Sequence, residues 1–367
     1  MKILHMADVH IDETKTVNGK IILNEHGINI RLCDLLDCLE QVKEIAKKEK
    51  VSLIIIAGDL YERKQPLDFE YYTASKLMSE LTDIAPVVLI AGNHDSENAI
   101  EALSFINNVT VLKPFTPVRF EQVTLFGLPY PDLSEADALT LKKQLEEKTV
   151  QTTKFLRKSS NFLICVGHVS VEGASYPTTS QLSDVALSVK AFEGIDYVAL
   201  GHIHKPQQIK NVYYPGSIDT WKRQEADQKK GFYIIDTDTA EVTFYTIKTR
   251  PVYNFKFYID SIPEKIEVED GAIVTIEVEV EDSRTSLYDR KKILEVLTGN
   301  PLDVKIIPKI IRTQRPRCEA IIEAKNFEQT LITYMQQKQI DQDSINRILS
   351  KVSQLAKEIN IPYDFTN

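Results

Sequence analysis

The stretch VSLIIIAGD, residues 51–59, decides the fold of this chain. It is a continuous apolar run, typical of a strand buried on both faces, and it stops at the metal-ligand residue Asp59. Ligands bind beyond the carboxyl ends of strands in layered α/β folds. Four further apolar runs end in the same way: residues 1–7 before Asp8-Val9-His10, residues 86–91 before Gly92-Asn93-His94-Asp95, residues 161–166 before Gly167-His168, and residues 195–200 before Gly201-His202-Ile203-His204. We therefore expect five strand ends to bring seven ligands to one edge of one sheet, namely Asp8, His10, Asp59, Asn93, His168, His202 and His204.

The spacing of these residues predicts how they share two ions. Side chains at i and i+2 of an extended segment point the same way, so Asp8 and His10 are expected to reach one ion together. His202 and His204 face one site in the same manner, where each is able to hold a different ion. Asp59, alone after its strand, is the candidate bridge between the two ions.

The remaining motif residues supply a neutral oxygen, an imidazole and a candidate acid. Asn93 offers a carbonyl oxygen and His168 a ring nitrogen, whereas His94 should point elsewhere and be free to act as an acid. Oxygen and imidazole donors without a thiolate suit Mn²⁺, Fe or Zn²⁺, and we favour octahedral Mn²⁺. Two such ions clamp the attacking and leaving oxygens of a phosphate, so the pattern predicts a two-metal phosphoesterase.

Composition limits the remaining classes. With 43% hydrophobic and 26% charged residues among 367, the chain is neither disordered nor fibrous. No apolar run approaches the about 20 residues of a membrane span, and Asp8 interrupts the first run too early for a secretory signal, so we expect a cytoplasmic protein. The four cysteines form no CxxC pair, which predicts reduced thiols.

The net charge of −9 argues against a nucleic-acid partner, because affinity for DNA depends on Lys and Arg. The charge is unevenly spread, however. Residues 301–317 contain Lys305, Lys309, Arg312, Arg315 and Arg317 but one acid, Asp303.

The order of predicted elements divides the chain into three parts. Strands alternate with helices near residues 32–46, 66–82 and 134–158, which predicts a largely parallel α/β sheet with helices outside. From residue 212 strands follow one another through tight turns, which suggests a second sheet packed on the first. Arg250-Pro251 marks a boundary before a small α+β module with a helix near 287–297, and two helical patterns follow Phe327. We expect domains at 1–250, 251–325 and 326–367.

The motifs resemble the calcineurin-like metallophosphoesterase superfamily and, within it, the SbcD type of DNA double-strand-break repair nuclease subunit. The resemblance rests on LHMADVH, IIIAGDLYE, LIAGNHD, ICVGHVS, IDYVALGHIHKPQ, YYPGSIDTW and KKGFYIID, all within residues 1–250. It implies a four-layer αββα sandwich with a small α+β cap that helps to place DNA. It also implies a homodimer, and an SMC-like ATPase of the SbcC type that binds the C-terminal helices.

Carried over residue by residue, the resemblance assigns the site. One metal would be held by Asp8, His10, Asp59 and His204, and the other by Asp59, Asn93, His168 and His202. His94 matches the catalytic histidine, with Asp95 as its support. Glu62 stands where relatives often carry Asp or His, and the candidate substrate contacts are Glu62, Tyr130, Lys205, Lys305 and Arg312.

Three functions follow from these observations. The first is a Mn²⁺-dependent DNA exonuclease and endonuclease. The second is a cyclic-nucleotide phosphodiesterase or protein phosphatase of the same superfamily, although Ala91 and Glu62 depart from the RGNHE and GDxxDRG patterns of the phosphatases. The third is a scaffold that tethers DNA ends without catalysis, against which the intact ligand set argues.

Overall fold

The computed structural model describes residues 1–131, 133, 137–176, 185–311 and 327–358. It contains two compact units, Met1–Val278 with Asp289–Ile307 and Glu279–Tyr288 with Pro308–Asn367. The division at residues 250 and 325 remains a prediction, and Arg312 lies outside the described residues. No helix among those described is both long and apolar enough to cross a membrane.

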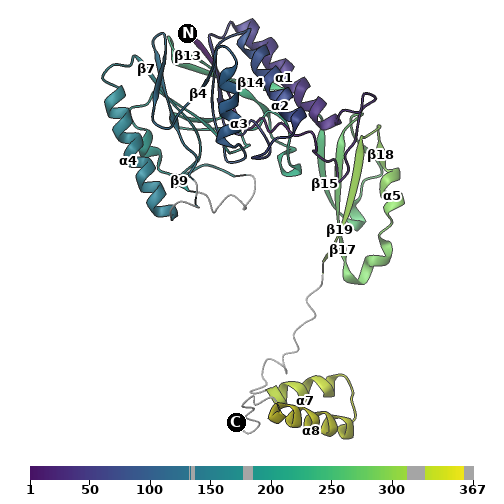
Figure 1. Ribbon diagram of the computed structural model, residues 1–367. Helices are drawn as coiled ribbons and strands as arrows, with labels where there is room; N and C mark the ends of the chain where they lie inside the picture. The colour runs from purple at the N-terminus through teal and green to yellow at the C-terminus, as the bar shows by residue number, and fades with distance from the viewer. Residues whose placement is uncertain (132, 134–136, 177–184, 312–326, 359–367) are drawn as a thin grey trace. The chain divides into compact units, whose positions relative to one another are not determined.

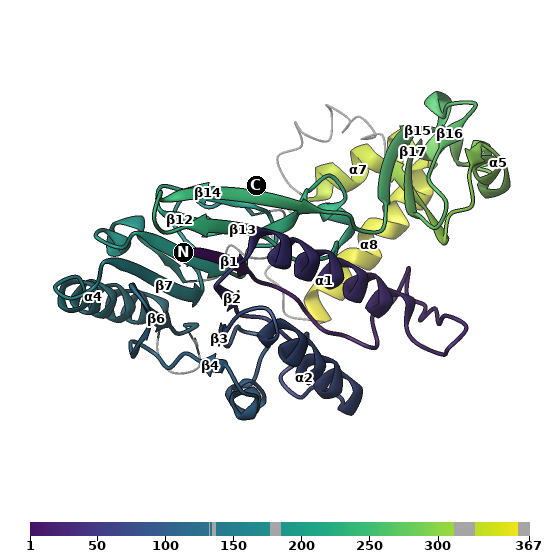
Figure 2. The same cartoon turned by 90° about the horizontal axis from the view of Figure 1, so that it is seen from above.

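The first of two six-stranded sheets has the order β14-β13-β1-β2-β3-β4. Its strands are β1 (Lys2–Met6), β2 (Leu53–Ala57), β3 (Val87–Ile90), β4 (Val109–Val111), β13 (Lys230–Asp236) and β14 (Glu241–Ile247). The first four are parallel, whereas β13 runs antiparallel to β1 with His5 opposite Tyr233. Figure 2 shows these strands side by side along one layer.

The second sheet has the order β11-β12-β10-β7-β6-β5. Its strands are β5 (Pro117–Phe120), β6 (Val123–Leu128), β7 (Phe162–His168), β10 (Tyr197–Gly201), β11 (Gln207–Ile209) and β12 (Val212–Tyr214). The expectation that the second sheet begins at residue 212 is therefore wrong. The chain already enters it at β5, while β13 and β14 return to the first sheet because β13 pairs with the N-terminal strand.

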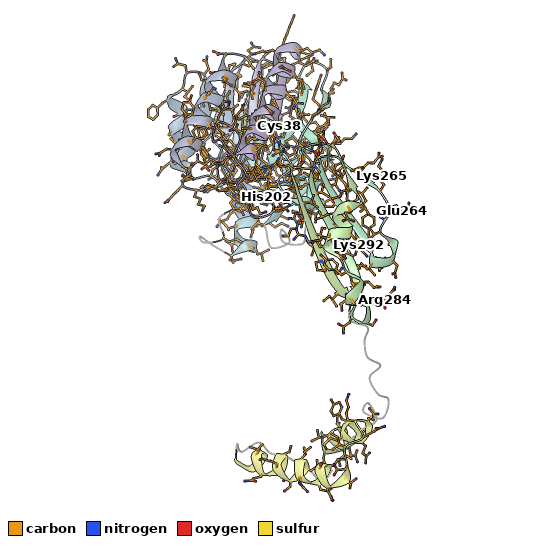
Figure 3. The ribbon with its side chains drawn as sticks, turned by 90° about the vertical axis from the view of Figure 1, so that its right-hand side faces the viewer. Cys38, His202, Glu264, Lys265, Arg284 and Lys292 are labelled. Atoms are coloured by element: carbon orange, nitrogen blue, oxygen red, sulfur yellow. The ribbon has the colours of Figure 1, made fainter. Side chains whose placement is uncertain are left out.

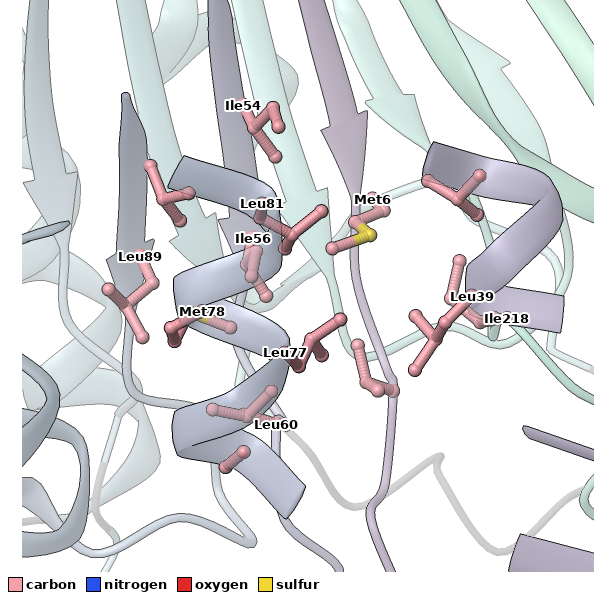
Figure 4. Close-up of a cluster of buried hydrophobic side chains, with 14 of the residues drawn as sticks. Met6, Leu39, Ile54, Ile56, Leu60, Leu77, Met78, Leu81, Leu89 and Ile218 are labelled. Carbon is pink, nitrogen blue, oxygen red and sulfur yellow. The ribbon is translucent and has the colours of Figure 1, made fainter. Parts of the chain in front are cut away.

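Three hydrophobic cores show that the molecule is layered. The helices α1 (Ile30–Glu49), α2 (Asp68–Thr82) and α3 (Glu97–Glu101) cover the first sheet, and α4 (Ala138–Leu156) covers the second (Figure 1). Alternation along β1 divides its side chains, because Leu4 and Met6 join the core under α1 and α2 whereas Ile3 joins the core between the sheets. Figure 4 shows the first core, where Met6 and Ile56 face Leu77 and Leu81 of α2. The expected αββα sandwich is confirmed.

The α+β module contains a three-stranded sheet, a two-stranded sheet and a short helix. They are β15 (Val252–Tyr258), β17 (Ile273–Glu281) and β19 (Asp303–Ile311); β16 (Ile266–Glu267) and β18 (Leu297–Thr298); and α5 (Arg290–Glu295). The helix expected over 287–297 is shorter: α5 begins only after Asp289, which caps it by accepting from Lys291 N, and it ends at Glu295. Figure 3 labels Glu264, Lys265 and Lys292 in this module.

The remaining elements are short or lie near the C-terminus. They are β8 (Ser170–Val171), β9 (Ala186–Leu187), the 3₁₀ turns Ala102–Phe105, Val189–Phe192, Arg223–Glu225, Ile259–Ser261 and Asp282–Leu287, and the helices α7 (Phe327–Gln337) and α8 (Gln342–Glu358). The two helical patterns predicted after Phe327 are thus confirmed. Met335 of α7 and Ile345 of α8 are both buried.

Candidate metal centre

The five predicted strand ends meet, but they belong to two sheets. Strands β1, β2 and β3 of the first sheet and β7 and β10 of the second end on the same side of the sandwich, and hydrogen bonds join them there. Nδ1 of His168 lies 2.9 Å from the carbonyl oxygen of Ala57, and the amide of His202 donates to Oδ1 of Asp8 at 3.0 Å. The expectation of one edge of one sheet is therefore wrong, because a buried apolar run does not specify which sheet it joins.

The backbone at these ends is left-handed rather than extended. Asp8, His10, Asp59 and His202 have φ values of 51°, 52°, 50° and 91°. Such conformations cost roughly 1–3 kcal/mol each and persist where the surroundings hold them. Here Asp8 N donates to Gly58 O at 3.1 Å and His10 N donates to Asp59 O at 3.0 Å. Asp8 and His10 converge as expected, but through this turn and not through a shared face of a strand.

One cluster consists of Asp8, His10 and His204. Their ligand atoms lie within 4.8 Å of one another. Nε2 of His10 is 3.1 Å from Nε2 of His204, and Oδ1 of Asp8 is 3.9 Å and 3.8 Å from these nitrogens. All three residues are buried.

A second cluster surrounds Asn93. Its Oδ1 lies 3.1 Å from Nε2 of His168 and 3.0 Å from Nδ1 of His202. Asp59 lies between the clusters, because its Oδ2 is 3.1 Å from Nε2 of His168 and 3.7 Å from Nε2 of His10. The structure thus brings all seven expected ligands together.

These donors fit divalent cations in their chemistry and in their orientation. A metal-binding histidine usually has its second ring nitrogen held by a carbonyl or a carboxylate. Nδ1 of His168 is held by Ala57 O and Nδ1 of His204 lies 2.8 Å from Glu225 Oε1, so that Nε2 of each ring is left for an ion. Nδ1 of His10 lies 2.8 Å from Glu62 Oε2 but makes no hydrogen bond within the described residues.

In the absence of a metal, the carboxylates and imidazoles of the site stabilise each other's charged forms. Burial alone would raise the pKa of Asp59, but His168 and His10 lower it below its ordinary value. Burial alone would lower the pKa of His168, but Asp59 and Asp8 raise it to about 9. Because a ligand histidine must be neutral, a cation bound by His168 would replace this proton.

The candidate ligands open onto a small cleft, which we call the metal cleft. His94 lies at its edge, and its lining also includes His10, Asp59, Glu62, Asn93, His202, His204, Trp221 and Lys222. The backbone N–H of His94 donates to Oδ1 of Asp59 at 2.9 Å, and its side chain is 38% exposed. Nδ1 lies 2.7 Å from the carbonyl oxygen of Glu62, which only accepts, so Nδ1 carries a proton. The remaining nitrogen, Nε2, is the one available to exchange a proton with a substrate.

The carboxylate of Asp95 is held by backbone amides. Its carboxylate accepts hydrogen bonds from the amides of Gly92, Leu60 and Tyr61 at 2.9–3.2 Å. Burial and the nearby Asp59 raise its pKa to about 6. Asp95 thus fixes the backbone just before Glu62, whose carbonyl oxygen contacts His94 Nδ1, and its support of His94 remains a prediction.

The predicted substrate contacts separate into two groups. Glu62 lines the cleft, and the ring of Tyr130 lies 5.8 Å from that of His202. Lys205 instead lies 3.3 Å from Ser175 Oγ, and Lys305 lines a neighbouring cavity. Neither lysine is among the residues that line the cleft.

Glu225 was missed by the sequence analysis. Besides His204 it accepts from Nζ of Lys230 at 2.8 Å and from the amide of Trp221 at 2.9 Å. Burial would raise the pKa of Glu225, but His204 and Lys230 lower it well below its usual range. A single Glu in a short 3₁₀ turn belongs to no periodic pattern, so only the neighbouring KKGFYIID motif pointed to this region.

A two-sheet sandwich with candidate metal ligands at the strand ends is typical of metal-dependent phosphoesterases. Comparison with known proteins gives the same class. A model of the calcineurin-like phosphoesterase family matches residues 1–206. The chain belongs to the calcineurin-like phosphoesterase family and is a metal-dependent hydrolase.

Particular relatives are also similar. The SbcD subunit of nuclease SbcCD from Staphylococcus epidermidis is 28% identical over 298 residues, which cover 74% of this chain and 76% of the relative. Among solved structures, TT1561 of Thermus thermophilus has a TM-score of 0.42 and 12% identity, covering 67% of this chain and 99% of that one. GAP50, the anchor in the inner membrane complex of Plasmodium, has a TM-score of 0.41 and 11% identity, covering 68% and 89%.

Proposed function

We propose that this protein is the nuclease subunit of a DNA double-strand-break repair complex and hydrolyses DNA phosphodiesters. The observation that carries the proposal is the convergence of seven ligand side chains from two sheets, with His94 beside them. The similarity to a subunit of nuclease SbcCD favours DNA over other phosphodiesters.

Two groups of ligands share Asp59. Asp8, His10 and His204 would hold one cation with Asp59, and Asn93, His168 and His202 would hold the other with Asp59. When bound, two divalent cations, Mn²⁺ by preference, polarise the phosphate and activate water. Asn93 and the imidazoles keep the net charge of the site positive, which attracts an anionic substrate.

His94 supplies a proton to the leaving oxygen. The carbonyl of Glu62 holds its Nδ1–H, and this contact fixes the ring so that Nε2 serves the substrate. The carboxylate of Glu62 lies 3.9 Å from Nδ1, on the side of the ring opposite the nitrogen that would meet the substrate.

The partners are proposed from the resemblance of the motifs, and the similarity to a subunit of a nuclease complex supports assembly with a further subunit. An SMC-like ATPase of the SbcC type would bind α7 and α8, a homodimer would form, and the complex would act on DNA in the cytoplasm. Exposed apolar side chains on α8, Ile348 at 39% and Leu355 at 50%, support a docking role for this helix.

The test replaces His94 by serine. We expect His94→Ser to lose Mn²⁺-dependent release of nucleotides from duplex DNA while DNA binding persists, with the exposed His26→Ser as the matched control. Cleavage at the wild-type rate would refute the role of His94. Turnover of cyclic AMP in preference to DNA would instead favour a small-molecule phosphodiesterase, and DNA binding by a wild type without hydrolysis would favour a tethering scaffold.

A further inference from the structure

A second and larger cavity lies next to the metal cleft. It has a volume of about 460 Å³, whereas the cleft has about 90 Å³. Its walls come from the loop 15–19, the loop 220–224 and the beginnings of β15, β17 and β19. All of these residues belong to one compact unit. We call this cavity the Trp221 pocket.

The two cavities share a wall. Trp221 and Lys222 line both of them, and the indole ring lies 4.9 Å from the ring of the candidate ligand His10. Nζ of Lys15 lies 3.3 Å from the centroid of the indole. Nε1 of Trp221 is buried and has no hydrogen-bond acceptor among the described residues. Trp221 and Lys222 therefore form the wall between the Trp221 pocket and the metal cleft.

The lining of the Trp221 pocket is cationic. It includes Lys15, Arg31, Lys222, Arg223 and Lys305 and no Asp or Glu. The two inner cations already have carboxylate partners: Asp219 Oδ2 lies 3.3 Å from Lys15 Nζ and 2.6 Å from Arg31 Nη2, and Arg31 also pairs with Asp34.

The outer cations differ in this respect. Lys222 and Lys305 are exposed, and neither has a carboxylate partner within the part of the chain that the structure describes. They are available to an external anion. Beside them, Val252 and Ile273 provide an apolar surface.

The sizes of the two cavities indicate what this lining binds. A space of about 90 Å³ accommodates a phosphate but not a nucleotide, so the rest of a substrate strand must leave the cleft. The Trp221 pocket lies within the ~300–1,000 Å³ of ordinary ligand sites. Cations that follow a backbone, with aromatic and apolar surface for bases, are the usual surface for single-stranded nucleic acid.

We propose that the Trp221 pocket binds the nucleotide adjacent to the scissile phosphodiester, with Lys222 and Lys305 on its phosphate. This inference rests on the proposed nuclease function and adds to it the path of the strand beyond the metal centre. It accounts for Lys305 as a substrate contact although Lys305 lies outside the metal cleft.

The test measures the salt dependence of DNA binding. A labelled oligothymidylate is titrated with metal-free protein in chelator from about 50 to 200 mM salt, where each lost phosphate contact lowers the slope by about 0.7 for a single strand. We expect Lys305→Gln and Lys222→Gln each to lower the slope by this amount and to raise the KM for the oligonucleotide with Mn²⁺. Both side chains are exposed, so the variants should fold.

Lys292→Gln is the matched control, since it removes an exposed positive charge from α5, away from the pocket lining (Figure 3). If both Lys305→Gln and Lys222→Gln bind the oligothymidylate with the salt dependence of the wild type, the proposal that the Trp221 pocket binds the strand is wrong. An equal loss of affinity for thymidine monophosphate would overturn the strand assignment in favour of a free-nucleotide site. A wild type that neither binds nor cleaves the oligonucleotide would instead overturn the proposed function itself.

Discussion

Replacing Glu225 by glutamine should weaken cation binding through the tautomer of His204. Glu225 is 1% exposed and meets three donors: the ring N–H of His204, the ammonium of Lys230 and the amide of Trp221. A glutamine has one oxygen and one NH₂ group for these positions. Lys230 is buried and requires the oxygen, so the NH₂ group faces Nδ1 of His204.

This exchange moves the proton of His204. Nδ1 must then accept, so Nε2 carries the proton and no longer offers a lone pair to an ion. Loss of such an outer partner costs 10–100-fold in metal affinity, about 1.4–2.7 kcal/mol. We expect this loss at one cation site and a smaller effect at the other, since Asn93, His168 and His202 do not contact Glu225.

Isothermal titration of metal-free protein with Mn²⁺ measures both sites. The exposed Glu264→Gln is the control for the chemical change alone. Wild-type Mn²⁺ affinity in Glu225→Gln would refute the reasoning.

Two further perturbations address the ligand geometry and the core. Gly92→Ala should reduce Mn²⁺ affinity and hydrolysis at least tenfold. The new Cβ would lie 2.2 Å from Asp59 Oδ1, so the Asp59 side chain would have to move. Wild-type rates of hydrolysis of duplex DNA would contradict this prediction. Burial lowers the pKa of His5 from 6.5 to about 3. Between these pH values the unfolded chain binds a proton at His5 that the folded chain does not. The free energy of unfolding therefore decreases as the pH falls from 6.5 toward 3. Between pH 6.5 and 4.5 this loss is roughly 2 kcal/mol, and denaturant midpoints for His5→Gln should fall less over that range than those of the wild type; parallel curves would exclude His5.

The strand ends were predictable because they depend on local signals. An apolar run such as 51–57 is long enough only for a buried strand, and a polar ligand directly after it must lie at the strand's carboxyl end. The helices over 32–46 and 66–82 were equally predictable, because apolar residues at helical spacing form one buried face on α1 and α2.

The assignment of strands to sheets was not predictable in this way. β2 and β7 are both buried at every residue, yet one pairs with β1 and the other with β6. A buried apolar strand gains the same hydrophobic stabilisation in either sheet. Which strand it pairs with therefore depends on the loops and helices that connect the strands and on how the two sheets pack together. The left-handed turn at Asp8 is set in the same way, by bonds to the loop after β2.

The amino-acid sequence by itself determined the strand ends and placed seven candidate ligands and His94 directly after them, because each follows from a run of neighbouring residues. Only the tertiary structure decided that these ligands meet between two sheets, that Glu225 holds His204, and that Lys305 belongs to the Trp221 pocket. The physical reason is range: burial and backbone direction act between adjacent residues, whereas a hydrogen bond or a cavity wall joins residues that the chain brings together only when it folds.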